Sequence, residues 1–337
     1  MTDIFFSQSG SEAFAGILND TKREYADNGC FFLDKNYIER IDSDFHAFPQ
    51  ILEIVYNAAE NLKKDSSAAF YALFVSRCME NRRLFIDNLG LFIFPENHSM
   101  LPFLCFLPFF ELMHKALCER KLPEDIIFHT LNQFEDCVFL FEKRFGFPGL
   151  NKRYFDFLQR YVDCRILNIS RLRFEIMNLE DQVFLIRGRN GMPYAAAAES
   201  PGEEVLVRPG DCCLSVHIPD HGDFSADSCH RSYKRALEVF KLHFPELDIK
   251  AFHCESWMLS PELEAHLKSS SRILAFAKDY TRYPVASEGK DVLNFVFLMK
   301  GLDNFENLPE DTSLQRSLKQ LYLSGGKIHE YGGLIPV

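Results

Sequence analysis

One short stretch of the sequence contains three residue types that can do enzyme chemistry, followed by a tryptophan. Cys254, Glu255 and Ser256 follow one another, and the only tryptophan of the chain, Trp257, comes next. A cysteine can act as a nucleophile, a carboxylate as a general base, and a serine hydroxyl as a hydrogen-bond donor to an oxyanion. Glu255 is the most informative of the four, because a carboxylate inside an apolar strand is costly to bury without a partner.

His217 is a second candidate, and the loop "DHGDFSADS" (220–228) follows it closely. Its imidazole could activate Cys254 as a nucleophile, or it could serve as a general base in its own right. Structural alternatives stay open. A cysteine often packs as a small apolar side chain, a tryptophan such as Trp257 can be a packing anchor, and a histidine can be satisfied by backbone groups.

Two predicted strands would place these residues side by side. Residues 210–219 and 248–258 are rich in β-forming residues, and residues 225–244 between them have the apolar spacing of an amphipathic helix. A strand–helix–strand unit favours a parallel pair with a right-handed crossover. The carboxyl ends of the two strands then lie together, which is where ligands bind in open α/β sheets.

Alternation along a strand separates the candidates by face. In the second strand it places His253 and Glu255 on one face and Cys254 on the other. The alternation does not fix which of the two faces lines a cleft. We expect His253 and His266 to be surface residues.

The rest of the second half predicts a mixture of strands and helices. Joins from strand to strand favour antiparallel pairing around the central parallel pair, so we expect a mixed sheet with helices on its faces, an α+β domain. The further strands are expected at residues 170–179, 181–188, 271–281 and 291–299, and the further helices at residues 260–268 and 313–326.

The first half has the apolar spacing of helices. Residues 48–64, 66–90 and 123–146 each present one apolar face. The chain contains 34 phenylalanines, which favours an aromatic-rich helical core, with an apolar groove for a long-chain ligand as the alternative. Glycines and a proline within residues 145–150 indicate a domain boundary. We therefore expect an α-helical domain over residues 1–148 and a second domain over residues 149–337.

The composition excludes several classes of function. The formal net charge is −11, whereas a nucleic-acid binder needs a basic face. There is no basic run suited to an anionic membrane surface, no signal-peptide pattern and no apolar stretch long enough to cross a bilayer. The ten cysteines lack the spacing of a zinc site. We expect a cytoplasmic protein with reduced thiols, without a metal, and without a nucleic-acid or membrane partner.

The segment over residues 214–276 resembles bacterial acyltransferase-domain proteins, which join a helical N-acyltransferase N-terminal domain to a GNAT-like C-terminal domain. Their pattern contains a VHIP strand, a serine inside the next helix, an F-x-C-x-S-W-x-L-x-P stretch and a final serine–x–isoleucine segment. The stretch "NISRLRFE" (168–175) is similar to the strand with which their second domain begins. The matching residues here are Val216, His217, Ile218, Pro219, Ser232, Phe252, Cys254, Ser256, Trp257, Leu259, Pro261, Ser271 and Ile273.

The resemblance implies how the second domain would bind its substrates. In GNAT acyltransferases two neighbouring parallel strands splay apart, and the acyl-CoA lies in the gap with its pyrophosphate on the following helix. The catalytic candidates are then Glu255 or His217 as the base, Cys254 and Ser256 in the gap, and Tyr280 or Tyr283 as the donor of a proton to the CoA thiolate. The candidates for binding acyl-CoA are Val216, His217, Gly222, Ser225 and Ser228, and those for binding the substrate are Trp257 and Arg171.

We therefore expect transfer of an acyl group from acetyl-CoA or a longer acyl-CoA to the amine of a small molecule or peptide. The R/Q-x-x-G-x-G/A loop of ordinary GNAT enzymes is absent. The loop over residues 220–228 contains Gly222 alone and three aspartates, which would repel an anion. One alternative is thus a catalytically silent GNAT-like module that binds a ligand or a protein. Another is a hydrolase or thiol acyl carrier that uses Cys254 and His217.

Overall fold

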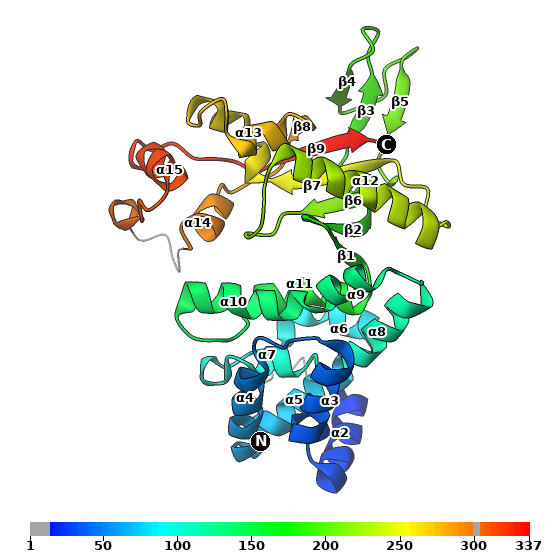
Figure 1. Ribbon diagram of the computed structural model, residues 1–337, viewed down its shortest axis with the longest axis vertical. Helices are drawn as coiled ribbons and strands as arrows, with labels where there is room; N and C mark the ends of the chain where they lie inside the picture. The colour runs from blue at the N-terminus through cyan, green and yellow to red at the C-terminus, as the bar shows by residue number, and fades with distance from the viewer. Residues whose placement is uncertain (1–13, 299–303) are drawn as a thin grey trace. The chain divides into compact units, whose positions relative to one another are not determined.

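The computed structural model describes residues 14–298 and 304–337. The chain forms two compact units that meet in the sequence between Arg165 and Ile166, and Figure 1 shows the elements of each. The first unit is helical and the second contains the sheets, so the α+β class expected from the sequence is confirmed. A boundary between separately folding domains after residue 148 stays a prediction.

Helices make up the regular structure of the first unit, and a core of phenylalanine rings holds them together. Phe48, Phe103 and Phe110 pack edge to face or tilted, as do Phe106, Phe134 and Phe155. Such ring pairs add to the stability gained from burying apolar area. The helices are α2 (Ala15–Asn28), α3 (Lys35–Phe45), α4 (Leu52–Lys64), α5 (Ser66–Glu80), α6 (Arg82–Asp87), α7 (Leu101–Leu104), α8 (Phe109–Glu119), α9 (Glu124–Leu131), α10 (Gln133–Phe145) and α11 (Lys152–Val162).

Two of the long helices expected from the sequence are each divided in the structure. The stretch 66–90 forms α5 and α6, with Asn81 between them accepting a hydrogen bond from the Leu84 amide. The stretch 123–146 forms α9 and α10, which meet at Asn132. At the first break the Asn81 side chain competes with the helical backbone for hydrogen bonds, so the helix stops while the apolar period continues. At the second break the Asn132 side chain donates to the His46 carbonyl at 2.7 Å.

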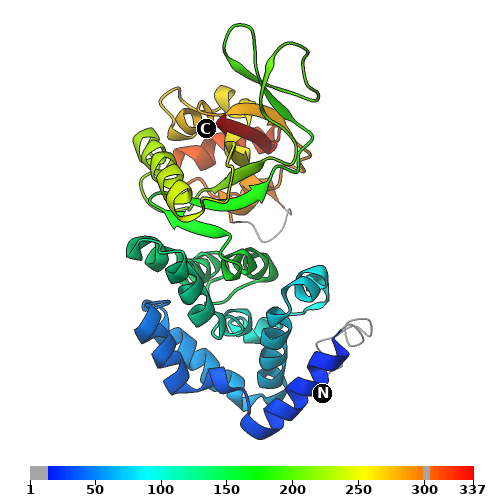
Figure 2. The same ribbon diagram turned by 90° about the vertical axis from the view of Figure 1, so that its right-hand side faces the viewer.

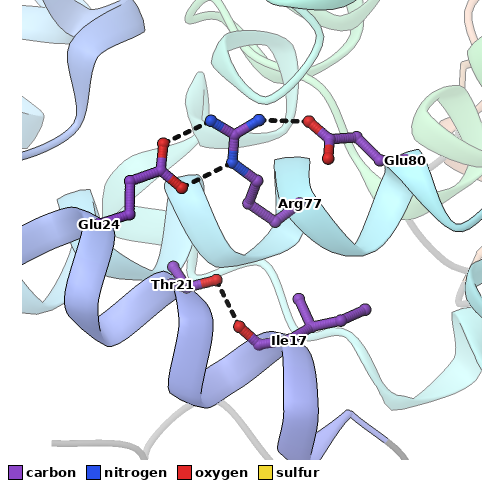
Figure 3. A network of polar contacts seen from close by, with 5 residues as sticks. All are labelled: Ile17, Thr21, Glu24, Arg77 and Glu80. Carbon is purple, nitrogen blue, oxygen red and sulfur yellow. Dashed lines mark hydrogen bonds and ion pairs between the residues drawn. The ribbon is translucent and has the colours of Figure 1, made fainter.

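An arginine joins α2 to α5 in the first unit. The Arg77 guanidinium donates through Nε to Glu24 Oε2 at 2.8 Å, and it also pairs with the Glu80 carboxylate (Figure 3). On the same face of α2, Thr21 Oγ1 donates to the Ile17 carbonyl at 2.7 Å. Two-pronged pairing of a guanidinium with a carboxylate fixes the geometry of the two helices as well as stabilising their contact.

A six-stranded mixed sheet is the centre of the second unit. The strand order is β1-β2-β6-β7-β9-β8, and among these strands only β6 and β7 are parallel. A second sheet has the order β4-β3-β5, and its hairpins extend beyond the first sheet in both views (Figures 1 and 2). The strands are β1 (Ile166–Ile169), β2 (Leu172–Asn178), β3 (Phe184–Arg187), β4 (Pro193–Ala196), β5 (Glu204–Val207), β6 (Cys212–His217), β7 (Ala251–Ser256), β8 (Thr281–Pro284) and β9 (Tyr331–Pro336).

Different elements cover the two faces of the six-stranded sheet. Helix α12 (Ala226–His243) packs on one face, where Tyr233 contacts Phe174 and Phe252. The three-stranded sheet packs on part of the opposite face through Leu185, Val207 and other apolar residues. We call these the helix face and the open face. The parallel pair joined by a helix, which the sequence predicted, is confirmed.

Two strand predictions were wrong. Residues 271–281 contain α13 (Arg272–Ala277), and the described part of residues 291–299 contains α14 (Asp291–Phe295). Short apolar runs do not distinguish a strand from a buried helix. This side of the sheet is formed instead by β9, the last strand of the chain, and by β8 at the edge. The other helical segments are α15 (Ser313–Leu323) and the 3₁₀ turns Trp257–Leu259 and Pro261–Ala265.

Candidate active site

The parallel ladder between β6 and β7 is short and ends before the strands do. It pairs Cys213 with Ala251, Leu214 with Phe252, and Ser215 with His253. Strand β6 continues to His217 and β7 to Ser256 without further pairing between them. At their carboxyl ends, β6 and β7 therefore no longer pair with each other.

His217 and a buried glutamate form a pair on the open face. His217 Nε2 lies 2.9 Å from Oε2 of Glu175, and Glu175 is only 4% exposed. The antiparallel register of β2 and β6 produces this contact, since Glu175 lies opposite Ser215, one alternation step from His217. A carboxylate that holds one imidazole nitrogen orients the ring and stabilises its protonated form, which suits a general base.

Sequence reasoning missed the role of Glu175, although a signal was present. In the stretch "LRFEIMN" (172–178) Arg173 and Glu175 alternate with apolar residues, and both are buried. Two buried charged residues at a period of two indicate that one face of the strand is polar inside the fold.

His253 lies in the interior, not on the surface as the sequence suggested. It is 5% exposed, and its Nε2 lies 3.1 Å from the Tyr283 hydroxyl and 3.4 Å from Asp181 Oδ2. The strand β7 is central because β9, far along the chain, pairs with its other edge. The second misjudged histidine, His266, is half-buried.

Glu255 is exposed at the carboxyl end of β7, on the same face as His253. Partial desolvation raises its pKa, and the negative charges of Asp181 and Glu330 raise it further, while His253 acts in the opposite direction. A carboxylate with a raised pKa is a better proton acceptor than an ordinary one.

Cys254 lies on the helix face and is 1% exposed. Burial raises the pKa of its thiol to about 12, so the thiolate population at neutral pH is very small. His217 lies on the other face of the sheet. These observations argue against a nucleophile–base pair of Cys254 and His217.

Ser256 and Trp257 have clear structural roles. The Ser256 hydroxyl accepts a hydrogen bond from the Met258 amide at 3.1 Å, which closes the turn after β7. Trp257 is buried in an apolar cluster with Leu263 and residues of α13, α14 and α15. Both residues shape the end of the strand.

The two tyrosine candidates lie on opposite faces. The Tyr280 hydroxyl is 2.8 Å from the Tyr233 hydroxyl under α12, and burial raises its pKa well above the usual value. The Tyr283 hydroxyl donates to Asp181 Oδ2 at 2.6 Å on the open face. Its pKa is also raised, first by burial and then by that carboxylate.

The loop between β6 and α12 is organised around Arg171. This guanidinium donates through Nη2 to the Pro219 carbonyl at 2.8 Å and stacks on the Phe224 ring at 5.3 Å. Within the described part of the chain, its buried Nε and Nη1 have no hydrogen-bond partner. Gly222, with φ of 86°, lies against the arginine side chain. Desolvation lowers the Arg171 pKa.

The remaining candidates lie close to this loop. The Ser225 hydroxyl caps α12 by accepting a hydrogen bond from the Ser228 amide, which is the usual role of an N-cap serine. Val216 is buried in β6, next to His217. The loop aspartate Asp223 accepts a hydrogen bond from Ser225 and lies 3.5 Å from Arg272, which offsets part of its charge.

Two properties can be stated for the described residues. None of their helices combines the length and apolar character needed to span a membrane. No group of three or more metal-binding side chains comes together among residues 14–298 and 304–337.

The fold is similar to that of several solved acyltransferase structures. One is an acyltransferase mutant in complex with octanoyl-CoA, with a TM-score of 0.68, 20% identity, and coverage of 90% of this chain and 87% of that chain. Another is an acyltransferase in complex with decanoyl-CoA and teicoplanin, with a TM-score of 0.68, 21% identity, and coverage of 89% and 86%. At such identities the similarity establishes the fold alone.

The sequence comparison leads to the family. No curated protein matches the chain. The family model of the GNAT-like C-terminal domain matches residues 166–335, which is half of the sequence and includes every strand of both sheets except the last residue of β9. The resemblance inferred from the motif residues is thus confirmed, and the chain belongs to the family of proteins with a GNAT-like C-terminal domain.

Proposed function

We propose that this protein transfers an acyl group from an acyl-CoA thioester to a primary amine, between the carboxyl ends of β6 and β7, where these two strands no longer pair with each other. The observation that carries the proposal is the parallel ladder that ends at Ser215 and His253, with the His217–Glu175 pair directly beyond it. Backbone groups on the facing edges of the two strands there can hold the thioester carbonyl, and a base lies next to them.

The reaction needs one base at the point of attack. The amine nitrogen forms a bond to the thioester carbon, and the bond from that carbon to sulfur breaks. His217 takes the proton that the nitrogen loses, and Glu175 stabilises the imidazolium that forms. The same proton then passes to the departing CoA thiolate, so that the products are an amide and a free thiol.

Arg171 is the residue that we assign to the CoA pyrophosphate. Its two unpartnered nitrogens lie beside the loop that leads into α12, and the start of that helix offers free N–H groups. A fixed guanidinium is a strong partner for phosphate oxygens. This arginine would take over part of the work of the glycine-rich loop that the sequence lacks.

The substrate classes follow by analogy with the similar structures. Those acyltransferases were determined with octanoyl-CoA, decanoyl-CoA and the glycopeptide teicoplanin. We propose a medium-chain acyl-CoA as donor and an amine of a small molecule or peptide as acceptor, with Trp257 shaping the acceptor end. The cysteines are free thiols, which suits the reducing cytoplasm that we propose as its compartment.

The experiment measures release of the CoA thiol from acetyl-, octanoyl- and decanoyl-CoA, with and without a panel of primary amines. We expect thiol release that requires an amine, together with the matching amide by mass spectrometry. No amine-dependent release with any of the three donors would overturn the proposal.

The aspartates of the loop favour a second candidate function, a silent module that binds ligands without turnover. For such a module, decanoyl-CoA at 100 times its Kd would stabilise the folded state by about 2.7 kcal/mol. The melting temperature would rise, and no amide would form. The acyltransferase predicts both the stabilisation and the amide.

A further inference from the structure

The open face holds a second histidine with its own carboxylate, which the reaction above does not use. His253 of β7, Tyr283 of β8 and Asp181 of the β2–β3 connection are joined by contacts of 3.1, 2.6 and 3.4 Å. They come from three separate parts of the chain, and two of them are almost fully buried. A connected buried polar group of this kind is costly to assemble.

A glycine makes room for the tyrosine in this group. Gly332 of β9 lies between Tyr283 on one side and Glu255 on the other. A Cβ at this position would lie 2.4 Å from the Tyr283 ring, so any other residue would displace the tyrosine. The close packing over Gly332 brings the Tyr283 hydroxyl to His253 in the next strand.

The hydrogen bonds fix which nitrogen of His253 carries a proton. Asp181 has a lowered pKa because of His253 and Tyr283, so it is a carboxylate at neutral pH and Tyr283 donates to it. The Tyr283 oxygen and Asp181 can then only accept from His253, which places the proton on Nε2. The lone pair of the ring is left on Nδ1.

This Nδ1 is buried and has no hydrogen-bond partner among the described residues. Buried polar atoms without a partner are rare in native folds. Glu255 is two residues further along the same strand face, so the Cα atoms of the two residues are about 7 Å apart at the usual rise of a strand. Glu255 is exposed, so its carboxylate can turn towards His253 and bring an oxygen within hydrogen-bond reach of Nδ1.

The acceptor itself supplies a reason for a second base. A primary aliphatic amine is an ammonium ion at neutral pH, with a pKa of about 10, as in lysine. It must lose one proton before it can attack and another when the amide forms. His217 accounts for the second proton only.

We propose, resting on the function above, that Glu255 and His253 remove the first proton, with Tyr283 and Asp181 holding His253 in the tautomer that can accept it. Glu255 contacts the ammonium and is the catalytic residue. His253 acts through Glu255 and is a positioning and relay residue.

The proton balance closes without another reactant. The ammonium gives a proton to the Glu255 carboxylate, and the free amine remains. The Glu255 carboxyl passes this proton to His253 Nδ1 and becomes a carboxylate again. Asp181 stabilises the imidazolium, which loses the proton to solvent after the product leaves. Besides His253, the charged groups that act on Glu255 are Asp181, Glu330 and Asp291, all acidic, and they favour a proton in this region.

The tautomer can be tested without any substrate. Nitrogen NMR of the full chain with labelled histidine, assigned with His253→Gln, should show His253 protonated at Nε2 and bare at Nδ1. In Tyr283→Phe the tautomers should become mixed, whereas Tyr322→Phe, which alters another buried tyrosine of this unit, should leave the His253 signals unchanged. A proton on Nδ1 of the unaltered protein would overturn the inference even if the enzyme is active.

The role in catalysis can be tested with two amines of the same shape. With decanoyl-CoA as donor, 2-phenylethylamine is cationic at neutral pH and O-benzylhydroxylamine is not. We expect His253→Gln and Glu255→Gln to lower kcat/KM at pH 7 about 10-fold or more for the cation and less than about 2-fold for the neutral amine. For the cation, the rate should recover as the pH rises towards its pKa.

The outcomes separate a relay from a structural role. An equal loss with both amines would mean that the substitutions disturb the fold or the cleft, and no loss with either would remove the relay. If the unaltered protein acylates no amine, the proposed function fails, and the NMR result still decides whether His253 is held as inferred.

Discussion

The two faces of the six-stranded sheet differ in chemistry although the same strands build both. On the helix face, β7 presents Phe252 and Cys254 to α12, and both are almost completely buried. On the open face the alternate residues of this strand are His253 and Glu255. Alternate residues of one strand thus belong to the core and to the candidate site, and a shift of one residue in the strand register would exchange the two sets.

Two adjacent glycines of β9 show the same division. Gly332 leaves room on the open face for Tyr283, and Gly333 leaves room on the helix face for Tyr280. Tyr283 joins a network of ionisable groups, whereas Tyr280 bonds only to another buried tyrosine, Tyr233, among the hydroxyl contacts described. The chemistry that we propose therefore lies on the open face, and the packing against α12 lies on the helix face.

The largest effect is expected from the base on the open face. His217→Gln keeps a side chain that can bond to Glu175 but cannot accept a proton. We expect kcat to fall by about 10²–10⁴-fold while the melting temperature changes little. Thiol-release assays and calorimetry measure the two quantities.

His266→Gln is the matched control, since this half-buried histidine lies outside the open-face group. If His217→Gln and His266→Gln retain the same activity, the open face is not where the chemistry occurs.

A substitution on the helix face should have the opposite profile. Phe252→Ala removes a ring that packs against Phe174 and Tyr233, and we expect a loss of about 3–5 kcal/mol in the free energy of unfolding. Urea denaturation measures this loss. Below the lowered melting temperature, kcat should stay close to that of the unaltered protein, and a selective loss of kcat would break the division between the faces.

Low pH should weaken the contacts of the open-face network before it affects the apolar packing on the helix face. The folded-state pKa of Asp181 lies below its ordinary value, so its stabilising contribution is present above that ordinary value and is lost as the pH falls through the folded-state pKa. Asp181→Asn should therefore flatten the acid limb of stability against pH. The limb is measured by thermal melts at a series of pH values, and an unchanged limb would contradict the pairing of Asp181 with His253.

The smallest effect is expected at Cys254. Because its thiol has a pKa of about 12 and is buried, iodoacetamide at neutral pH should label the exposed Cys118 and leave Cys254 unmodified. Peptide mass spectrometry after brief labelling distinguishes the two sites. Rapid modification of Cys254 would restore the thiol chemistry that the structure argues against.

The parallel pair and its helix were predictable because each element has a strong local signal, and so was the loop that leads into α12. The partners of the histidines were not. Glu175 and Asp181 reach His217 and His253 only through the register of distant strands. The burial of His253 depends on β9, a strand with two glycines that local β-propensity disfavours.

A crystal structure of the protein with decanoyl-CoA can show directly whether acyl-CoA binds between β6 and β7 on the open face. We expect the thioester carbonyl at the facing strand edges beyond Ser215 and His253, the sulfur near His217, and the pyrophosphate at Arg171. Continuous pairing of β6 and β7 with the ligand bound elsewhere would contradict this binding mode.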